Sequence, residues 1–327
     1  MDTRPRLTPA IANVRRAVRE SFENPVLLSA KRVILGVSGG ADSMALALAC
    51  AFELPKLNIE IHAVVVDHNL QPGSDQVAQE ALARLRSLGI ENAHSISIQF
   101  ANSGQGPEAA ARDARYQALE QKRVELGADF ILTGHNLDDQ AETVLLGLTR
   151  GSGLRSIAGM QLVDGQIVRP LLEISKSELR QACQDSGVSY WEDPHNQDSS
   201  FTRVRIRKLM ELIDSELGPG VPAALARTAA LASEADDYLT TGAQELIDEA
   251  NAGQNGYLVE PLSKAHLALR RKALQLIAAS LVSGGVSRSQ VEAIDQLITN
   301  WHGQKPMQLS GITVERVRDQ ILFKQSS

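Results

Sequence analysis

Residues 38–43, Ser-Gly-Gly-Ala-Asp-Ser, have the composition of a loop that binds an anion. Gly39 and Gly40 can adopt backbone angles that other residues avoid, and they let an anion approach the backbone closely. If a helix starts directly after them, its free N–H groups point at the same anion, and serine hydroxyls add further donors. We therefore predict a phosphate-binding loop formed by Ser38, Gly39, Gly40, Ala41, Asp42 and Ser43.

Asp42 is the unexpected residue of this loop, because a carboxylate repels phosphate unless a Mg²⁺ ion lies between them. The loop is not followed by the Gly-Lys-Ser/Thr of Walker-type proteins, and it lacks the G-x-G-x-x-G spacing of dinucleotide-binding folds. It resembles instead the loop of the PP-loop superfamily, whose members cleave ATP between the α and β phosphates. That resemblance implies ATP and Mg²⁺ as cofactors and a reaction that leaves AMP on the substrate.

Residues 133–143, Thr-Gly-His-Asn-Leu-Asp-Asp-Gln-Ala-Glu-Thr, hold a second concentration of reactive side chains. His135 has the pKa range that suits proton transfer near neutrality. Helix capping accounts for one acid at a helix start, but not for three acids beside a histidine. We predict that His135, Asp139 and Glu142 are catalytic together with Asp42. Carboxylates at Asp138 and Asp139 could share a magnesium ion with Asp42.

Two further segments each allow two interpretations. On the helix expected at 108–126, Glu108, Arg112, Arg115 and Tyr116 recur at helical spacing. They form either a salt-bridged surface or a pair of arginines set against phosphate or adenylate. We adopt the second interpretation and count Arg112 and Arg115 as catalytic. The pair Asp67-His68 is either a polar turn after a strand or a contact to adenosine, and we place it in the ATP site.

The segment 201–208 is strongly basic. Arg203, Arg205, Arg207 and Lys208 occur there with no acid among them. A net charge of -6 and a pI near 5.7 argue weakly against a nucleic-acid partner for the chain as a whole. Because local patches decide phosphate binding, we predict that this segment contacts RNA.

Short apolar runs alternate with helical patterns over the first two thirds of the chain. Strands are expected at 33–37, 59–66, 94–99 and 129–133, and helices at 43–52, 74–88, 108–126 and 137–148. This alternation implies an α/β fold, a parallel sheet with helices on both faces, whose ligands bind beyond the carboxyl ends of the strands. The loop at 38–43 and the segment at 133–143 both fall at such ends.

The alternation stops at Gly218-Pro-Gly-Val-Pro222. Helical patterns follow at 223–250, 263–282 and 288–300, and residues 306–324 have the pattern of two or three short strands. We therefore predict a catalytic domain over 1–218. A smaller, mainly helical accessory domain with short terminal strands is predicted over 219–327.

Six blocks, in order over roughly residues 30–210, together resemble the tRNA(Ile)-lysidine synthetase family. They are Ser38–Ser43, Val66-Asp-His-Asn, Glu108-Ala-Ala-Ala-Arg-x-x-Arg-Tyr116, Thr133–Thr143, Arg169-Pro-Leu-Leu and Glu192-Asp-Pro-x-Asn196. The blocks at 108–116 and 133–143 are far more specific than the phosphate loop. The length is that of the short form of the family, without a further C-terminal domain. Gln71, Ser156 and Val204 depart from the family pattern, which puts RNA and loop contacts in question but not ATP use.

The resemblance implies a two-step reaction on a tRNA(Ile) with a CAU anticodon. ATP adenylates the C2 oxygen of the wobble cytidine, and L-lysine then displaces AMP to give lysidine. A lysine amine must lose a proton before it attacks, and His135 or Glu142 is the base that this implies. Phosphate contacts to the tRNA would come from the basic segment. Lys264, Arg270, Arg271 and Lys272 are candidates for accessory contacts.

Further features of the sequence argue against several other classes of protein. Cys50 and Cys183 are the only cysteines, which argues against a tRNA thiolase and against a disulfide framework. The basic segment argues against a small-molecule amide ligase, and the convergence of acids with His135 argues against a non-enzymatic RNA-binding protein. No secretory signal or membrane-length apolar run is visible, so we expect a cytoplasmic enzyme. The oligomeric state is left open, with a homodimer as one option.

Overall fold

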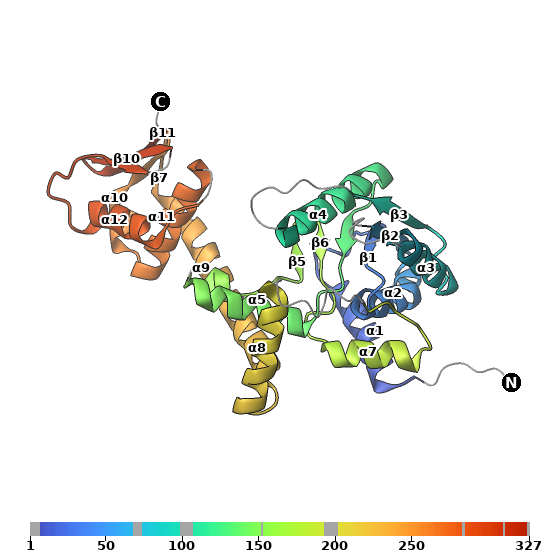
Figure 1. Ribbon diagram of the computed structural model, residues 1–327. Coiled ribbons are helices and arrows are strands. Elements are labelled where there is room, and N and C mark those ends of the chain that lie inside the picture. Colours follow the sequence, from blue (N-terminus) through green and yellow to red (C-terminus); the bar gives the residue numbers. More distant parts are fainter. Residues whose placement is uncertain are drawn as a thin grey trace. The chain divides into compact units, whose positions relative to one another are not determined.

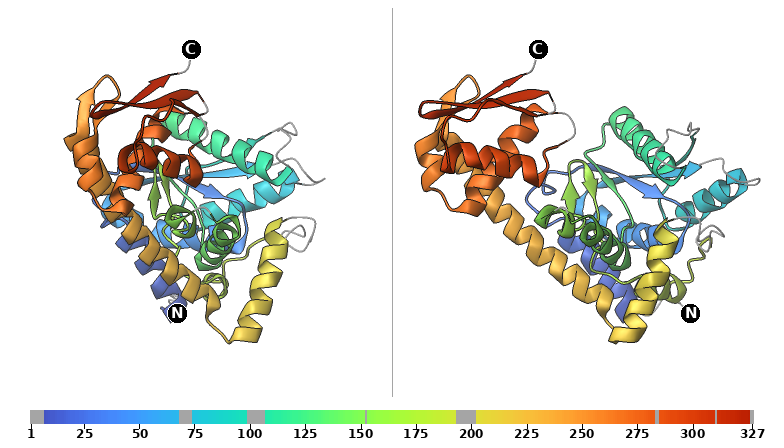
Figure 2. Two further views of the ribbon diagram at one scale, coloured as in Figure 1. Left: turned by 90° about the vertical axis from the view of Figure 1, so that its left-hand side faces the viewer. Right: turned by 60° about the vertical axis from the view of Figure 1, so that its left-hand side comes forward.

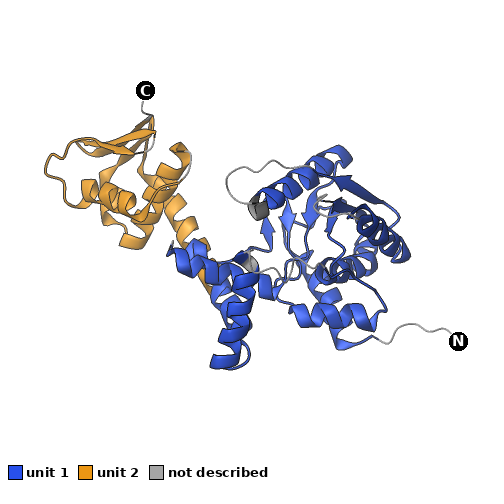
Figure 3. Cartoon of the chain, viewed as in Figure 1, with its two compact units in different colours: residues 1–230 blue, residues 231–327 orange. Residues whose placement is uncertain are grey.

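The computed structural model describes residues 7–67, 74–98, 107–151, 153–192, 202–282, 285–309 and 311–325. Side chains at 107–109, 203 and 325 are not described. The chain divides into two compact units, residues 1–230 and 231–327 (Figure 3). The predictions at His68 and at the block 193–196 lie outside the described residues.

Unit 1 is built on a six-stranded sheet in the order β3-β2-β1-β4-β6-β5 (Figure 1). The strands are β1 (Arg32–Val37), β2 (Glu60–Asp67), β3 (Ala93–Ser97), β4 (Phe130–Leu132), β5 (Val163–Asp164) and β6 (Ile167–Val168). Neighbours pair in parallel except for the β5–β6 hairpin at one edge. The expected parallel sheet is confirmed, with an added antiparallel edge strand.

Helices cover both faces of this sheet, as the views in Figure 2 show. Val33, Leu35 and Val37 of β1 pack in one buried cluster, while Ile34 lies in another. The first cluster includes residues of α1 (Pro9–Ser21), α2 (Ala41–Glu53), α3 (Ser74–Ser87) and α7 (Lys176–Asp185). The second includes Leu119 of α4 (Pro107–Leu126). A strand buried on both faces is the arrangement typical of parallel sheets.

Unit 1 contains further helical elements. They are the 3-10 turn η1 (Leu54–Leu57), α5 (Leu137–Arg150), α6 (Leu154–Ile157) and α8 (Thr202–Leu217). Helix α9 (Val221–Ala250) continues across residue 230, where the two units divide. The break at 218–222 is a turn between two helices, in which Asp214 Oδ1 accepts hydrogen bonds from Gly220 and Val221 N–H. The two compact units therefore divide inside α9, and the domain boundary near Gly218 stays a prediction.

Unit 2 combines helices with a five-stranded antiparallel sheet in the order β7-β8-β11-β10-β9. Its elements are α10 (Val259–Lys264), α11 (Leu267–Leu281), α12 (Arg288–Thr299), β7 (Asn251–Gly253), β8 (Gly256–Leu258), β9 (Met307–Leu309), β10 (Ile312–Val317) and β11 (Gln320–Gln325). The last three were expected, but the β7–β8 hairpin was not. The hairpin closes through Gln254 and Asn255, which take positive φ angles of 50° and 58°, as in a tight hairpin turn.

Among the helices that the structure describes, none has the length and apolar content needed to cross a bilayer.

Candidate active site

The phosphate loop has the predicted context, because β1 leads through Ser38–Gly40 directly into α2. Gly39 has a φ of 81°, a conformation that favours glycine. Ser43 Oγ donates to the carbonyl of Gly40 at 3.0 Å and accepts from Ser38 N–H at 3.2 Å. The carbonyl of Gly39 accepts from Trp191 N–H at 2.9 Å. Ser43 therefore shapes the loop, and the loop stands at the N-terminus of α2, where an anion is stabilised.

Gly134 brings the second motif against the first. A Cβ atom at this position would lie 3.0 Å from the carbonyl carbon and oxygen of Asp42 and 3.1 Å from the amide nitrogen of Ser43. Only a glycine lets the segment after β4 approach the first turn of α2 this closely. This close approach explains how two motifs far apart in sequence form one site, and Gly134 is a functional position that our sequence analysis did not single out.

The start of α5 positions the acids. Asn136 Oδ1 accepts from Asp139 N–H at 3.0 Å, and Asp139 Oδ2 accepts from Asn136 N–H at 3.2 Å, which is a capping box. Asn136 is buried, so this cap holds the helix start firmly. Asp139 therefore uses one carboxylate oxygen to hold the helix start and turns the other, Oδ1, toward Arg207.

Asp138 faces in another direction. Its Oδ2 accepts a hydrogen bond of 2.8 Å from the N–H of Lys176, the first residue of α7. A carboxylate at a helix N-terminus stabilises that helix. No group of three or more His, Cys, Asp or Glu side chains within the described ranges is arranged to hold a metal by itself. The geometry thus gives Asp138 a helix-capping role, which the sequence analysis had not assigned to it.

Asp42 is an acid of the site whose pKa is strongly shifted. Burial raises the pKa of Asp42 to about 6, and the charge of Asp139 raises it as well, against the lowering effect of Lys176, Arg207 and Arg180. Its Oδ1 is buried and has no hydrogen-bond partner among the described residues. A buried carboxylate oxygen left in this state is costly unless a ligand supplies a positive partner. Asp42 and Asp139 therefore fit a divalent cation that arrives with the phosphates.

Arg207 is placed differently from its prediction as an RNA contact. Its Nε lies 2.6 Å from Glu142 Oε1, and its Nη2 lies 3.4 Å from Asp139 Oδ1. The Glu142 side chain is only 6% exposed, so this ion pair is largely removed from water. The side chain reaches from α8 into the acidic cluster of α5, and its role as an RNA contact stays a prediction. The basic pattern of residues 203–208 could not reveal this, because it shows charge but not direction.

Arg205 and Lys208 of the same helix are exposed, and Arg205 Nη2 donates to Thr202 Oγ1 at 3.0 Å. Their role as RNA contacts stays a prediction. The side chain of Arg203 lies outside the described residues.

His135 and the arginines of α4 complete the predicted set. His135 Nδ1 lies 2.8 Å from the hydroxyl of Thr133, a buried residue that orients the imidazole. The Arg112 and Arg115 guanidinium carbons lie 5.0 and 5.4 Å from the ring centroid of Tyr116. This stacking holds the two arginines on one helix face. Asp67 ends β2 opposite Ser97, and its part in ATP binding remains a prediction.

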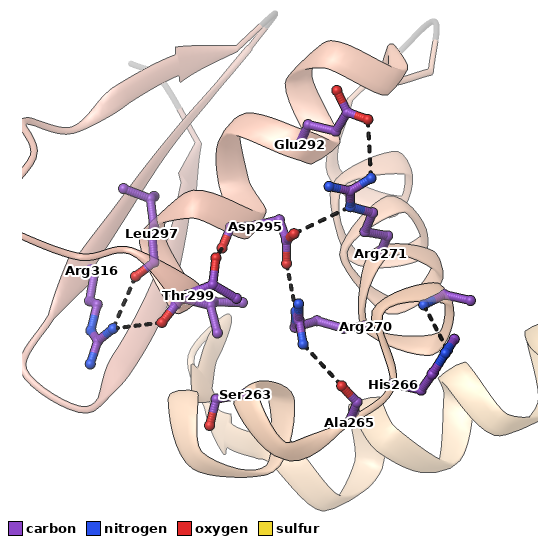
Figure 4. Close-up of polar contacts among 12 residues, drawn as sticks. Ser263, Ala265, His266, Arg270, Arg271, Glu292, Asp295, Leu297, Thr299 and Arg316 are labelled. Carbon is purple, nitrogen blue, oxygen red and sulfur yellow. Dashed lines mark hydrogen bonds and ion pairs between the residues drawn. The ribbon is translucent and has the colours of Figure 1, made fainter.

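The accessory cations proposed for the C-terminal region are engaged within unit 2, and Figure 4 shows two of them, Arg270 and Arg271. Arg270 is buried and donates through Nε to Asp295 Oδ1 and through Nη1 to the carbonyl of Ala265. Arg271 pairs with both Asp295 and Glu292. Lys272 pairs with Asp236, and Lys264 with Glu260. Arg270 in particular stabilises the packing of α11 on α12 and is not available to RNA.

Two glycines of the site should respond differently to alanine. Gly134→Ala forces a Cβ against backbone atoms of Asp42, and we expect it to destabilise the protein by about 1–3 kcal/mol. Gly40→Ala meets the Ser38 hydroxyl at 3.5 Å, an ordinary contact distance, so stability should stay near wild type while ATP binding weakens. Urea unfolding and calorimetric ATP titration measure the two effects. Equal stability of both variants would contradict the close contact at Gly134.

Comparison with known proteins supplies an independent view of the chain. Residues 11–213 match the family described as a PP-loop domain, and residues 258–322 match the TilS substrate binding domain. A tRNA(Ile)-lysidine synthase of Leifsonia xyli subsp. xyli is 44% identical, with 89% of each chain covered. One of Streptomyces coelicolor is 43% identical, covering 89% of this chain and 84% of that protein.

A solved structure shares the fold at much lower identity. The U34-tRNA thiolase NcsA of Methanococcus maripaludis is 19% identical and has a TM-score of 0.57, covering 67% of this chain and 78% of that one. This similarity supports the predicted PP-loop fold of unit 1. It carries no argument about the reaction, because proteins of one fold perform different chemistry.

Proposed function

Because the chain belongs to the tRNA(Ile)-lysidine synthase family, we propose that it uses ATP to join L-lysine to C2 of the wobble cytidine in a CAU-anticodon tRNA(Ile). The observation that carries the mechanism is the buried Oδ1 of Asp42 in the phosphate loop, which has no hydrogen-bond partner within the described ranges. An unpartnered carboxylate oxygen supports cation binding at the loop in addition to anion binding. The product would read AUA in place of AUG.

In the first step, the C2 oxygen of cytidine attacks the α-phosphorus of ATP and pyrophosphate leaves. Backbone N–H groups of 38–43 and the α2 N-terminus hold the departing pyrophosphate. Asp42 and Asp139 would hold Mg²⁺, which neutralises charge on the phosphates when it is bound. Asp138 is left out of this set because it caps α7. Arg112 and Arg115 are proposed to contact the adenylate, where a planar guanidinium suits phosphate oxygens.

In the second step, the lysine amine attacks C2, the C2–O bond breaks and AMP leaves. The amine is protonated at neutral pH and must lose a proton first, since its usual pKa is about 10.4. Asp139 and Glu142 attract a cationic group, as in their contacts with Arg207. Glu142 Oε1 already accepts from that arginine, whereas Thr133 orients the imidazole of His135. We therefore assign the proton transfer to His135.

His135→Ala should slow lysine transfer by about a hundredfold or more near neutral pH, because that is the smallest usual contribution of a general base. The measurement starts from preformed adenylated tRNA, adds lysine and follows AMP release across pH. Adenylation without lysine serves as the control and should change little. Full lysine-transfer rates across pH would exclude His135 and leave Glu142 as the base.

The function itself is tested by incubating the protein with ATP, labelled lysine and unmodified tRNA(Ile). We expect label in the RNA and one AMP for each lysine joined. AMP formation from another substrate without lysine in RNA would remove the lysidine reaction and keep the adenylation. Sulfur transfer is disfavoured, because Cys50 and Cys183 are both buried and separate thiols. Because the proposed substrate is a tRNA, we also propose that the enzyme is cytoplasmic.

A further inference from the structure

The positive charges of unit 2 divide into two groups. Most of its lysines and arginines pair with a carboxylate, namely Lys264 with Glu260, Arg270 with Asp295, Arg271 with Glu292, Lys272 with Asp236, Arg288 with Glu292 and Lys324 with Glu315. Lys305, Arg316 and Arg318 have no carboxylate partner among the residues that the structure describes. These three are therefore the cations of the described part of unit 2 whose charge no described carboxylate neutralises.

One of the three cations, Arg316, lies over Trp301, and Lys305 and Arg318 follow these two residues closely in sequence. The Arg316 guanidinium carbon stands 4.7 Å from the Trp301 ring centroid, and Arg316 Nε donates to the carbonyl of Arg318 at 3.0 Å. Lys305 follows Trp301 in the same loop, which Gln304 closes by donating to the carbonyl of Asn300 at 2.7 Å. The loop after α12 and the turn between β10 and β11 are thus joined through Arg316.

Arg316 is held by carbonyls of α12 as well as by that of Arg318, so its guanidinium has a defined position. Its Nη1 donates to the carbonyls of Leu297 and Ile298 at 3.1 and 3.2 Å, near the C-terminus of α12 (Figure 4). A cation at that end of a helix is stabilised by the free carbonyls. The guanidinium is therefore fixed over Trp301 before any ligand binds.

Trp301 is 42% exposed. A tryptophan on a surface, beside cations that can reach phosphate, is the combination that binds single-stranded nucleic acid: the ring stacks on a base and the cations contact the flanking phosphates. Trp301 is also the sole tryptophan of unit 2, in a chain with only two. An aromatic with this exposure is poorly explained as part of the core.

We propose that Trp301, Lys305, Arg316 and Arg318 bind an unpaired nucleotide of the substrate tRNA other than the wobble cytidine. The wobble base is excluded because it must react at Asp42 in unit 1. The match of residues 258–322 to a substrate binding domain agrees with an RNA partner for this unit. This inference rests on the proposed function, since it takes the ligand to be the tRNA substrate.

The test compares full-length variants for binding to tRNA(Ile), measured at several salt concentrations. Trp301→Ala should weaken binding by about five- to a hundredfold, whereas Trp301→Phe keeps a stacking ring and most of the affinity. Lys305→Ala and Arg318→Ala should each lower the slope of log K against log salt by about 0.7–0.9. Arg288→Ala removes a paired surface cation and is the matched control, expected to change neither quantity.

Turnover separates this surface from the catalytic site. At saturating tRNA, kcat of Trp301→Ala should equal that of the wild type, with the loss confined to KM for tRNA. Wild-type affinity of Trp301→Ala, or a loss no larger than that of Arg288→Ala, would overturn the inference. Failure of the wild type to join lysine to tRNA would instead overturn the proposed function, while the binding comparison would still decide the role of Trp301.

Discussion

Asp42→Asn should reduce the rate of AMP formation from ATP and tRNA by about a thousandfold, because it removes the ligand that neutralises phosphate charge in the transition state. The substitution keeps the size of the side chain, so the loop should still bind ATP, but unproductively. Pyrophosphate release in the presence of tRNA(Ile) measures the rate, and calorimetry measures ATP binding. The structural reason for so large an effect is the buried Oδ1 of Asp42, which no described residue partners.

Asp138→Asn is the matched control for this prediction. The amide oxygen of the new side chain would still accept the hydrogen bond from Lys176 N–H, so α7 keeps its cap. We expect its rate within about threefold of wild type, since a contact to a helix N-terminus contributes little to the transition state. Loss of activity comparable with that of Asp42→Asn would restore Asp138 to the metal-binding set.

The same Asp42→Asn variant should be more stable than the wild type when no ligand is present. Folding raises the pKa of Asp42 from 3.8 to about 6, so the folded protein holds this proton more tightly than the unfolded chain. Wild-type stability therefore falls as pH rises from about 4 to 6, and the full penalty remains above that window. With EDTA and without ATP, we expect a gain of roughly 1–3 kcal/mol for the variant at neutral pH and none below about pH 4.

Arg207→Ala should reduce lysidine formation by about a hundredfold, because it leaves Glu142 and Asp139 without their cation inside the site. The free energy of unfolding should fall by about 2–3 kcal/mol, less than for a fully buried pair because the arginine is partly exposed. Rates at saturating tRNA and urea unfolding measure the two losses. Arg207→Lys keeps the charge but not the two-nitrogen contact, and it should recover only part of the activity.

Arg205→Ala on the same helix is the control for Arg207. Arg205 is exposed, so its loss should raise KM for tRNA and lower the salt dependence of binding while kcat stays near wild type. If Arg207→Ala gave that same pattern, with kcat unchanged, the RNA contact inferred from the basic segment would be correct after all. A double-mutant cycle with Glu142→Gln adds a direct check, since contacting charges should couple by about 1 kcal/mol or more.

The sequence by itself determined the parallel sheet and the strand-loop-helix context of residues 38–43. Strand and helix patterns come from local periodicity, and glycine at positive φ, as at Gly39, is a local backbone requirement. The six blocks of reactive residues were enough to place the chain in its family, which the comparisons then confirmed.

Only the tertiary structure decided which charged groups face each other. Asp138 and Asp139 are neighbours in sequence, yet one caps α7 and the other faces Arg207, because successive residues at a helix start point about 100° apart. Arg207 and Arg205 look alike in a basic run, yet Arg207 reaches the acids of α5 while Arg205 lies exposed. Arg270 looked like an RNA contact but is buried against Asp295, while Lys305, Arg316 and Arg318 have no carboxylate partner in the described part of unit 2. The physical reason is the same in each case: composition shows how much charge a segment carries, and only packing shows where that charge points.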